Sequence, residues 1–498
     1  MRAVTLLVGA ALPSFAQDIT LTSRDGALAL AGTLTSYDGE FYRLASDYGP
    51  LTIAADSVLC DGPACPDLLA PKALIRLIGD GEAGAALLPP LVAAFAQARG
   101  LDLRVPTGVV DGPTLLLQKG SETVLAEFTF TPAPPETARS AVADSRADLV
   151  VARFAPLDSS AQVLALDALI PIVAPENPVR GISTANLAAA LAGEIDNWKD
   201  LGGPDMPLVV HGLDKGSDLA SALAARLGQD PAPSQTHADL TALAGAVARD
   251  PWALAVTGRA SAGAARPLDL VDSCGFVLDP SPLAVMAQDY PLTLPIYLLT
   301  PQRRLPLMAR EFLEFLSLPP AQEAIAAQGF VARSLQTRPL AGDGARLINA
   351  IKAADGGDAL AQLQRLAQLM EVANRASISF RFEAGSDDID LTSQTLLAEL
   401  AQRIAAGQLA GQRAVLVGFS AETGNGEGDY AASIALADNV LSALSQLAPD
   451  IEASLWPSID GFGAALPMAC DTTPAGERLN RRVELWLLPP LAGQGDDL

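Results

Sequence analysis

Residues 164–218 carry the sequence feature that most limits what this chain can fold into, because they hold an ordered series of strand, turn and helix signals. The series begins with an apolar strand pattern at Leu164–Val173 and ends with a second apolar strand at Leu208–Val210 and the loop Lys215-Gly216-Ser217. Between them lie, in order, Pro175-Glu176-Asn177-Pro178, a Leu/Ala-rich helix ending near Gly193, Asn197-Trp198-Lys199 and Gly202-Gly203-Pro204. Trp198 is predicted to be a packing anchor, and His211 a partly buried, hydrogen-bonded histidine.

The same alternation of short strands and Ala/Leu-rich helices starts at Pro71. Strands are predicted at Leu74–Ile78, Leu101–Val105 and Asp148–Ala152, and a helix at Leu87–Gln97. Alternating strands and helices indicate an α/β architecture, for which we expect a largely parallel sheet.

The order of elements resembles the periplasmic phosphate-binding proteins of ABC importers. Its closing part, Tyr290-Pro291-Leu292 followed by the segment from Gln322 to Gly329-Phe330, is also similar to that family, so the resemblance covers about residues 72–333. It implies a two-lobed, type II periplasmic binding fold over residues 71–337, with a small anion such as phosphate held in the cleft between the lobes. It further implies a periplasmic protein that is not an enzyme and that serves the membrane subunits of an ABC importer.

Three loops stand where this family holds its anion on helix N-termini, where free backbone N–H groups and partial positive charge converge. They read Gly79-Asp80-Gly81-Glu82, Asp111-Gly112-Pro113-Thr114 and Gly216-Ser217-Asp218. The family has hydroxyl donors at several of these positions, whereas an ionised carboxylate only accepts hydrogen bonds. Several acids around one dianion oppose its binding, and Lys215 and Arg153 offset part of that charge.

The candidate ligand residues are therefore Asp80, Gly81, Glu82, Asp111, Thr114, Arg153, Lys215, Gly216, Ser217 and Asp218. An acid at a helix start also serves as an N-cap, so Asp80 and Asp111 have a structural interpretation beside the ligand one. Lys215 and Arg153 can equally be ordinary salt-bridged charges.

A second resemblance covers about residues 378–488. Phe380-Arg381-Phe382, Gly418-Phe419-Ser420, Gly461-Phe462-Gly463 and Asn480-Arg481-Arg482-Val483-Glu484 follow the pattern of the OmpA-like domains, α/β modules that bind peptidoglycan. The resemblance implies an Asp and an Arg that hold the zwitterionic diaminopimelate of the wall.

This chain lacks both charged groups at those positions. Ala421 stands in place of the Asp and Leu436 in place of the Arg, while Asp429 replaces an Asn and Ser433 is retained. Ser420, Arg481 and Arg482 remain from the pattern, and we favour a structural role for the arginines through a pair with Glu484. We therefore expect weak or no peptidoglycan binding from this module.

The rest of the chain divides around these two regions. Residues 1–16 are predicted to be a secretory signal peptide, with Arg2, an apolar stretch and small residues before Ala16. Alternating residues and turn signals predict a small β-rich module at 17–70. Residues 338–376 are predicted as a helical linker, and 489–498 as a flexible tail.

Four cysteines fit an oxidising compartment. Cys60 and Cys65 flank a turn-rich tetrapeptide and are predicted to form a local disulfide. Cys274 and Cys470 either pair or remain buried thiols, since four cysteines allow three connectivities.

Charge and motif content exclude several functions. Lys+Arg 33 against Asp+Glu 57 gives a net charge of −24, which opposes nucleic-acid binding. We find no nucleophile elbow, Walker loop or zinc-ligand helix, and two histidines leave little room for a catalytic triad. We expect no enzyme activity, no cofactor and no metal.

Two hypotheses follow. The first is a periplasmic solute-binding protein with an OmpA-like cell-envelope module, located in the periplasm and associated with the outer membrane or cell wall. The second is a non-catalytic envelope adaptor in which both inherited sites are degenerate.

Overall fold

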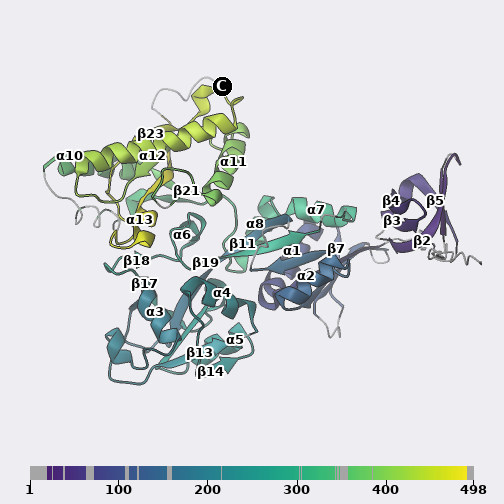
Figure 1. Cartoon of the computed structure of the whole chain (residues 1–498), viewed down its shortest axis with the longest axis horizontal. Coiled ribbons are helices and arrows are strands. Elements are labelled where there is room, and N and C mark those ends of the chain that lie inside the picture. Colours follow the sequence, from purple (N-terminus) through teal and green to yellow (C-terminus); the bar gives the residue numbers. More distant parts are fainter. Residues whose placement is uncertain are drawn as a thin grey trace, which may run out of the picture. The chain divides into compact units, whose positions relative to one another are not determined.

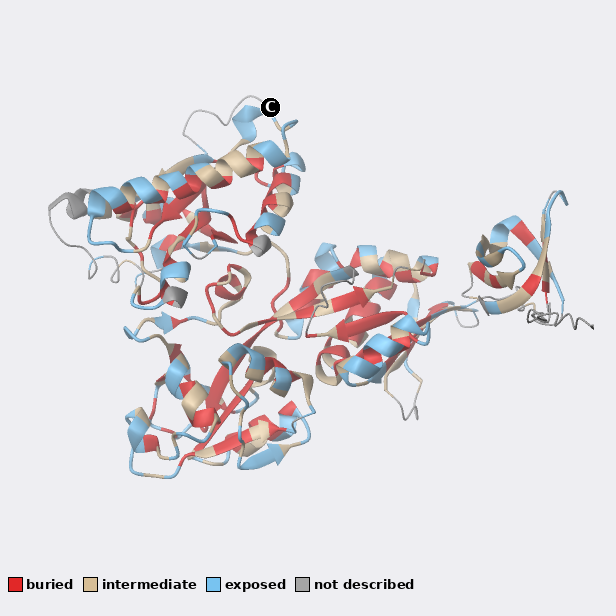
Figure 2. Cartoon of the chain, viewed as in Figure 1, coloured by how far each residue is buried: buried red, intermediate tan, exposed pale blue. Residues whose placement is uncertain are grey.

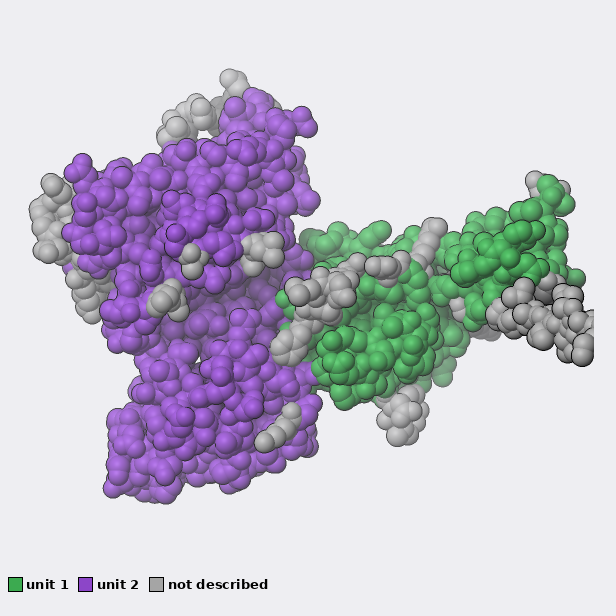
Figure 3. All heavy atoms as spheres, viewed as in Figure 1, with its two compact units in different colours: residues 1–162, 297–325 green, residues 163–296, 326–498 purple. Residues whose placement is uncertain are grey.

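The computed structural model describes residues 19–24, 26–37, 40–62, 65, 72–106, 112–120, 123–153, 160–214, 216–301, 303, 305–342, 344, 347, 351, 357–383 and 385–490. The predicted signal peptide and residues 491–498 of the predicted tail lie outside these ranges. The chain forms two compact units: unit 1 is Met1–Gln162 with Tyr297–Ile325, and unit 2 is Val163–Ile296 with Ala326–Leu498 (Figure 3).

The N-terminal part of unit 1 is the β-rich module that the sequence predicted. Five strands form an antiparallel sheet in the order β4-β3-β2-β1-β5. They are β1 (Ile19–Ser23), β2 (Ala29–Tyr37), β3 (Phe41–Ser46), β4 (Gly49–Ala54) and β5 (Val58–Asp61). Its core contains Leu21, Tyr42 and Leu44. The predicted Cys60–Cys65 disulfide is confirmed, with 5.8 Å between the Cα atoms.

The rest of unit 1 is a mixed sheet with helices packed on it (Figure 1). Its strands are β6 (Ala73–Gly79), β7 (Asp102–Arg104), β8 (Thr114–Lys119), β9 (Thr123–Pro132), β10 (Leu149–Ala152) and the end of β19 (Thr293–Thr300). Its helices are α1 (Gly81–Ala98), α2 (Pro135–Ala143), α7 (Leu307–Phe315) and the start of α8 (Pro319–Ala327). Phe95, Phe128 and Phe312 pack edge to face in its core.

The expectation of a largely parallel sheet is corrected here. β6 pairs parallel with β9 and β10, but β8 is antiparallel to β9 and β7 to β8. The β8–β9 hairpin was not predicted from the sequence. Its connection of three residues is too short for a parallel crossover, which needs a dozen residues or more.

Unit 2 begins with a lobe, residues 163–296, that holds the ordered series of the sequence analysis. Its strands are β11 (Ser160–Val173), β12 (Gly181–Ser183), β13 (Val209–Leu213), β14 (Gln235–His237), β15 (Ala253–Gly258), β16 (Arg266–Pro267), β17 (Asp269–Val271) and β18 (Val277–Leu278). Its helices are α3 (Thr184–Leu191), α4 (Asp218–Leu227), α5 (Leu240–Val247) and α6 (Pro282–Met286). Trp198 is fully buried and its indole N–H donates to the Trp252 carbonyl at 2.9 Å, as expected of a packing anchor.

The part of unit 2 from residue 336 to residue 490 is called the C-terminal module below. Its sheet has the order β20-β21-β24-β22-β23. The strands are β20 (Thr337–Pro339), β21 (Asn374–Arg381), β22 (Arg413–Phe419), β23 (Ser458–Gly461) and β24 (Arg482–Leu488). The helices are α10 (Gly357–Val372), α11 (Leu391–Ala405), α12 (Gly426–Leu447) and α13 (Pro474–Asn480). In Figure 2 the strands are largely buried, whereas α12 also exposes an outer face.

The predicted helical linker, residues 338–376, does contain the helix α10, but its role as a linker is corrected by this sheet. β20 pairs with β21, and α10 buries Leu366 and Met370 in a core with Phe419 and Trp486. Helical spacing of leucines in this segment thus reflects packing on the sheet and not a connection between domains.

Among the described residues, no helix combines the length and apolar character needed to cross a membrane.

Candidate functional site

The N-terminus of α1 is the first predicted anion loop. Asp80 follows β6 directly and caps the helix, since its Oδ1 accepts from the Ala83 N–H at 2.7 Å. The Asp80 N–H donates to the Val151 carbonyl at 2.9 Å. Gly79 has φ +131°, and a Cβ there would lie 2.0 Å from the Val151 oxygen, so the loop requires glycine. Asp80 is therefore an N-cap, one of the two interpretations that the sequence left open.

Arg153 completes this arrangement at the end of β10. Its Nε lies 2.6 Å from Asp80 Oδ2, and the two side chains are 1% and 3% exposed. The Asp80 carboxylate thus has a backbone N–H on one oxygen and a guanidinium on the other. In a buried site, such a pair leaves little net charge for a further anion. Gly81 and Glu82 lie in the first turn of α1, both half-buried.

The second predicted anion loop of unit 1 contains Thr114 and Asp111. Thr114 is half-buried at the first position of β8, opposite Thr129 of β9. Asp111 falls outside the described residues. The neighbouring Gly112 has φ +115°, and a Cβ there would lie 2.1 Å from the Phe130 oxygen.

The third predicted loop lies at the N-terminus of α4 in unit 2. Ser217 caps the helix, its Oγ accepting from the Ala220 N–H at 3.0 Å. Gly216 precedes it, and Asp218 begins the helix. Lys215 falls outside the described residues. Because the cap uses an oxygen lone pair, the Ser217 O–H is able to donate to a ligand.

The positions that the sequence analysis compared with a peptidoglycan site lie in the C-terminal module, where most of them are buried. Leu436 is 3% exposed within the core between α12 and the sheet. Asp429 is buried and accepts from the Thr423 hydroxyl at 2.5 Å and the Thr423 N–H at 3.2 Å. Ala421 is half-buried. Ser420 is buried, and its hydroxyl has no hydrogen-bond partner among the described residues.

The two arginines of the closing motif are held by the module itself. Arg482 is fully buried, with its Nε 2.8 Å from Glu484 Oε1, so the pair that the sequence analysis favoured is present. Arg481 donates to Asp387 Oδ1 at 2.6 Å and to the Ser386 carbonyl at 2.8 Å. Both contacts fit a structural role.

Sequence reasoning missed a histidine pair beside a cavity in the lobe of unit 2. His211 Nδ1 lies 3.1 Å from His237 Nε2, and His211 Nε2 lies 3.6 Å from Asp250 Oδ2. His211 is 3% exposed, and burial, with a smaller effect of His237, lowers its pKa, against the opposing effect of Asp250. The cavity has a volume of about 280 Å³ and is lined by His211, Leu213, Leu219, Leu223, Pro231 and Pro233, among others. A partly buried, hydrogen-bonded His211 was expected, but neither its full burial nor its partner His237 was.

Sequence reasoning also left one disulfide open and missed an ionic cluster. Cys274 and Cys470 are bonded, with 5.4 Å between their Cα atoms. Asp289 lies between Arg375 and Arg381, all three buried. The two arginines are six residues apart on β21, and this even spacing places both on the same face of the strand. That spacing was the sequence signal for the cluster.

Comparison with known proteins finds a match to one family model over part of the chain. Residues 139–318 match the model of the PBP superfamily domain. The phosphate-binding protein PstS of Borreliella burgdorferi is 44% identical over 61 residues, which are 12% of this chain and 22% of the relative. The chain thus aligns with about a fifth of the length of that curated relative.

The solved structures that this chain matches include a transport receptor and a PstS protein. An ABC-type phosphate transport receptor from Vibrio cholerae has 19% identity and a TM-score of 0.42, and the match covers 52% of this chain and 99% of the receptor. PstS from Borrelia burgdorferi has 16% identity and a TM-score of 0.37, with 52% and 98% covered.

Proposed function

We propose that this chain is a non-catalytic, extracytoplasmic solute-binding protein of the phosphate-importer type that takes a small anion, such as phosphate, between its lobes. The observation that carries the proposal is the start of α4, where Ser217 caps the helix through an oxygen lone pair and keeps its O–H able to donate to a ligand. A helix N-terminus attracts an oxyanion. The match to the PBP superfamily and the 61-residue similarity to a phosphate-binding protein support it.

The other ligand groups of this proposal come from all three loops of the sequence analysis. Gly81 and Glu82 lie beside Asp80, while Gly216, Ser217 and Asp218 belong to the start of α4. Thr114, Asp111 and Lys215 complete the proposed set. The proposed partners are the membrane subunits of an ABC importer.

We propose that the C-terminal module is an OmpA-like module with weak or no affinity for peptidoglycan, in a protein located at the outer membrane or wall. Ala421 offers no carboxylate, and Leu436 contributes to the core. Full-length protein is expected to stay in the supernatant when purified peptidoglycan is sedimented. Saturable co-sedimentation, competed by free diaminopimelate, would contradict this proposal.

A second candidate is an envelope adaptor in which both sites are degenerate. The observation that favours it is the Asp80 carboxylate, which already occupies the start of α1 and pairs with Arg153. In this case the chain has no small-molecule ligand and acts through its surfaces.

Calorimetric titration of inorganic phosphate into the full-length, oxidised protein at neutral pH distinguishes the two. The full chain is needed because a disulfide joins the lobe of unit 2 to the C-terminal module. Saturable binding, with a melting temperature that rises with phosphate, supports the solute-binding protein; phosphate at about 100 times Kd should stabilise by about 2.7 kcal/mol. If phosphate neither binds nor raises the melting temperature, the result supports the envelope adaptor.

A further inference from the structure

An ionic cluster is buried in unit 2 where the lobe contacts the C-terminal module. Asp289 follows α6 of the lobe, and α6 packs beside β21 of the module. Arg375 and Arg381 lie on β21, and Glu484 and Arg482 on β24. Each of the five side chains is at most 4% exposed.

The strand that carries the two arginines explains how they come together. In β21, Arg375, Ser377, Ser379 and Arg381 alternate with Ala376, Ile378 and Phe380. The apolar set lies in the core of the module. The polar set is also buried, with exposures of 3% or less, although a polar face of such a strand normally meets water. The lobe, through α6 and Asp289, therefore covers part of a face built from charged and hydroxyl groups.

Asp289 uses both of its oxygens on this face. Oδ2 lies 2.6 Å from Arg375 Nη2, and Oδ1 pairs with Arg381 Nη2. Arg375 Nη2 also donates to the Ser379 hydroxyl at 3.1 Å. Two guanidinium groups around one carboxylate form charge-assisted hydrogen bonds, which are stronger than hydrogen bonds between neutral groups.

The module alone does not balance this charge. Glu484 already contacts Arg375 Nε at 2.9 Å and Arg482 Nε at 2.8 Å, and it accepts from the Trp486 indole. The nearby Asp390 caps α11 and pairs with Arg478 at 3.0 Å. Without Asp289, three arginines would share the Glu484 carboxylate, and buried charge without a partner is strongly destabilising.

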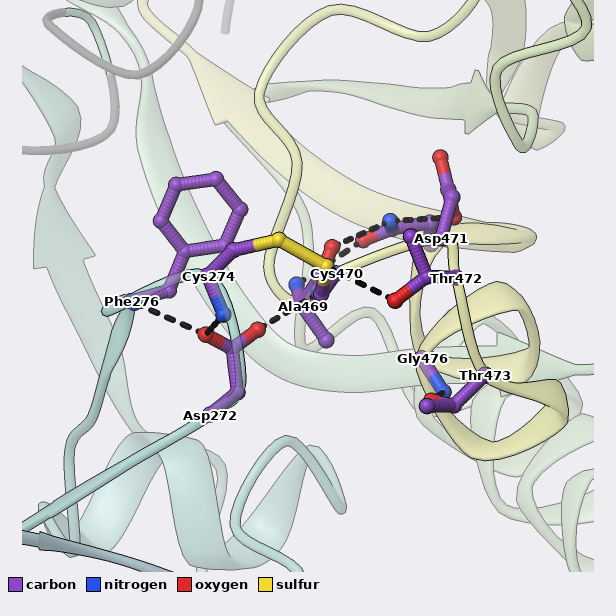
Figure 4. The surroundings of a disulfide bond; sticks show 10 residues. Asp272, Cys274, Phe276, Ala469, Cys470, Asp471, Thr472, Thr473 and Gly476 are labelled. Carbon is purple, nitrogen blue, oxygen red and sulfur yellow. Dashed lines mark hydrogen bonds between the residues drawn. A yellow bond between two sulfur atoms is a disulfide. The ribbon is translucent and has the colours of Figure 1, made fainter.

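A covalent link holds the same two parts of unit 2 together at another point. Cys274, in the β17–β18 hairpin of the lobe, is bonded to Cys470 of the module (Figure 4). The Asp272 carboxylate accepts from the backbone N–H of Cys274 at 2.9 Å and of Cys470 at 2.5 Å. These contacts keep the lobe close enough to present Asp289 to the module.

We propose that Arg375 and Arg381 form a carboxylate-binding site on the C-terminal module, that Asp289 is its resident ligand, and that the module is stable only with a carboxylate bound there. The lobe and module are then obligate partners within one chain, and the module does not act as a freely hinged anchor. The proposal is independent of phosphate binding, since none of these residues belongs to the anion loops.

Chemical rescue of full-length Asp289→Ala tests the proposal. All four tryptophans, at positions 198, 252, 456 and 486, belong to unit 2, so their fluorescence reports its unfolding. The variant should melt about 5 °C or more below the wild type. Potassium formate at about 100 mM should recover much of that loss by filling the vacated site, whereas potassium chloride at equal ionic strength should not.

Two control variants separate a carboxylate site from general effects of charge. Asp279→Ala removes an exposed carboxylate that pairs with Arg338 across 3.5 Å and accepts from the Ser281 N–H at 3.0 Å, and it should lower the melting temperature far less than Asp289→Ala does. Asp289→Asn keeps the side-chain volume, so formate should give it little rescue. A wild-type melting temperature for Asp289→Ala, or equal recovery in chloride, would overturn the proposal.

A double variant covers the case in which Asp289→Ala folds too poorly to measure. Arg381→Met removes one of the two guanidinium groups that Asp289 neutralises. Asp289→Ala/Arg381→Met should therefore be more stable than Asp289→Ala alone, a coupling that a double-mutant cycle measures. If the second substitution only adds to the loss, the uncompensated-charge argument is wrong.

Discussion

At the scale of single residues, Asp80 determines whether the first anion loop, at the start of α1, can bind phosphate. Its carboxylate caps α1 and pairs with Arg153, both in a buried setting. Asn is also a good N-cap but carries no charge. Asp80→Asn therefore keeps the helix start while releasing the Arg153 guanidinium from its resident carboxylate.

For Asp80→Asn we expect phosphate to bind at least about tenfold more tightly, about 1.4 kcal/mol, in a calorimetric titration. Without phosphate the variant should lose about 3–5 kcal/mol of unfolding free energy, because the buried Arg153 loses its ion pair with the Asp80 carboxylate. Asp144→Asn, which changes an exposed pair with Arg146, is the control. Weaker phosphate binding would instead mean that Asp80 accepts a hydrogen bond from a protonated phosphate oxygen.

His211 makes the stability of unit 2 depend on pH. Burial lowers its pKa below the unfolded value of about 6.5, with His237 adding to this and Asp250 opposing it. The unfolded chain then binds more protons, so the contribution is present above pH about 6.5 and is lost as pH falls toward the lower folded pKa. His211→Gln should reduce the difference in melting temperature between pH about 7.5 and about 5.5. An unchanged difference would assign the pH dependence to other groups.

At the scale of elements, two helices of the lobe begin with equivalent serine caps. Ser217 caps α4 and Ser183 caps α3, with Oγ–N distances of 3.0 and 3.1 Å. Only Ser217 lies in a proposed anion loop. Ser217→Ala and Ser183→Ala should each lower the unfolding free energy by about 0.5–2 kcal/mol.

The two variants should differ in phosphate binding. Ser217→Ala removes a hydroxyl donor to a charged ligand and should weaken binding by about 1.5–3 kcal/mol, measured by titration calorimetry. Ser183→Ala should leave the affinity unchanged. Equal affinities for both variants would remove the start of α4 from the site.

At the scale of the whole molecule, the two disulfides differ greatly in the chain length that they close. Cys274 and Cys470 are 196 residues apart, and Cys60 and Cys65 only five. In the chain-entropy model the longer loop contributes about 5 kcal/mol to stability and the shorter about 2 kcal/mol. Cys274→Ser/Cys470→Ser should therefore lower the denaturant midpoint, followed by tryptophan fluorescence, while Cys60→Ser/Cys65→Ser should leave that signal unchanged. Equal midpoints for wild type and the first variant would show that the link carries no stability.

The sequence by itself determined those parts of the protein whose causes are local. The β hairpins of the N-terminal module, the Cys60–Cys65 disulfide and the strand-helix series of the lobe follow from turn residues, short spacing and apolar periodicity. The cap at Asp80, one of two interpretations that the sequence left open, is equally local, because a cap depends on a side chain and an N–H three residues later.

Only the tertiary structure decided which partners meet across long stretches of chain. The alternation in β21 predicts one polar face but does not say that Asp289, 86 residues before Arg375, covers it. The leucines of α10 fit a linker or a packed helix equally until β20 joins the sheet. Pairing of Cys274 with Cys470, and of Asp80 with Arg153, depends in the same way on contacts that helix and strand periodicity does not encode.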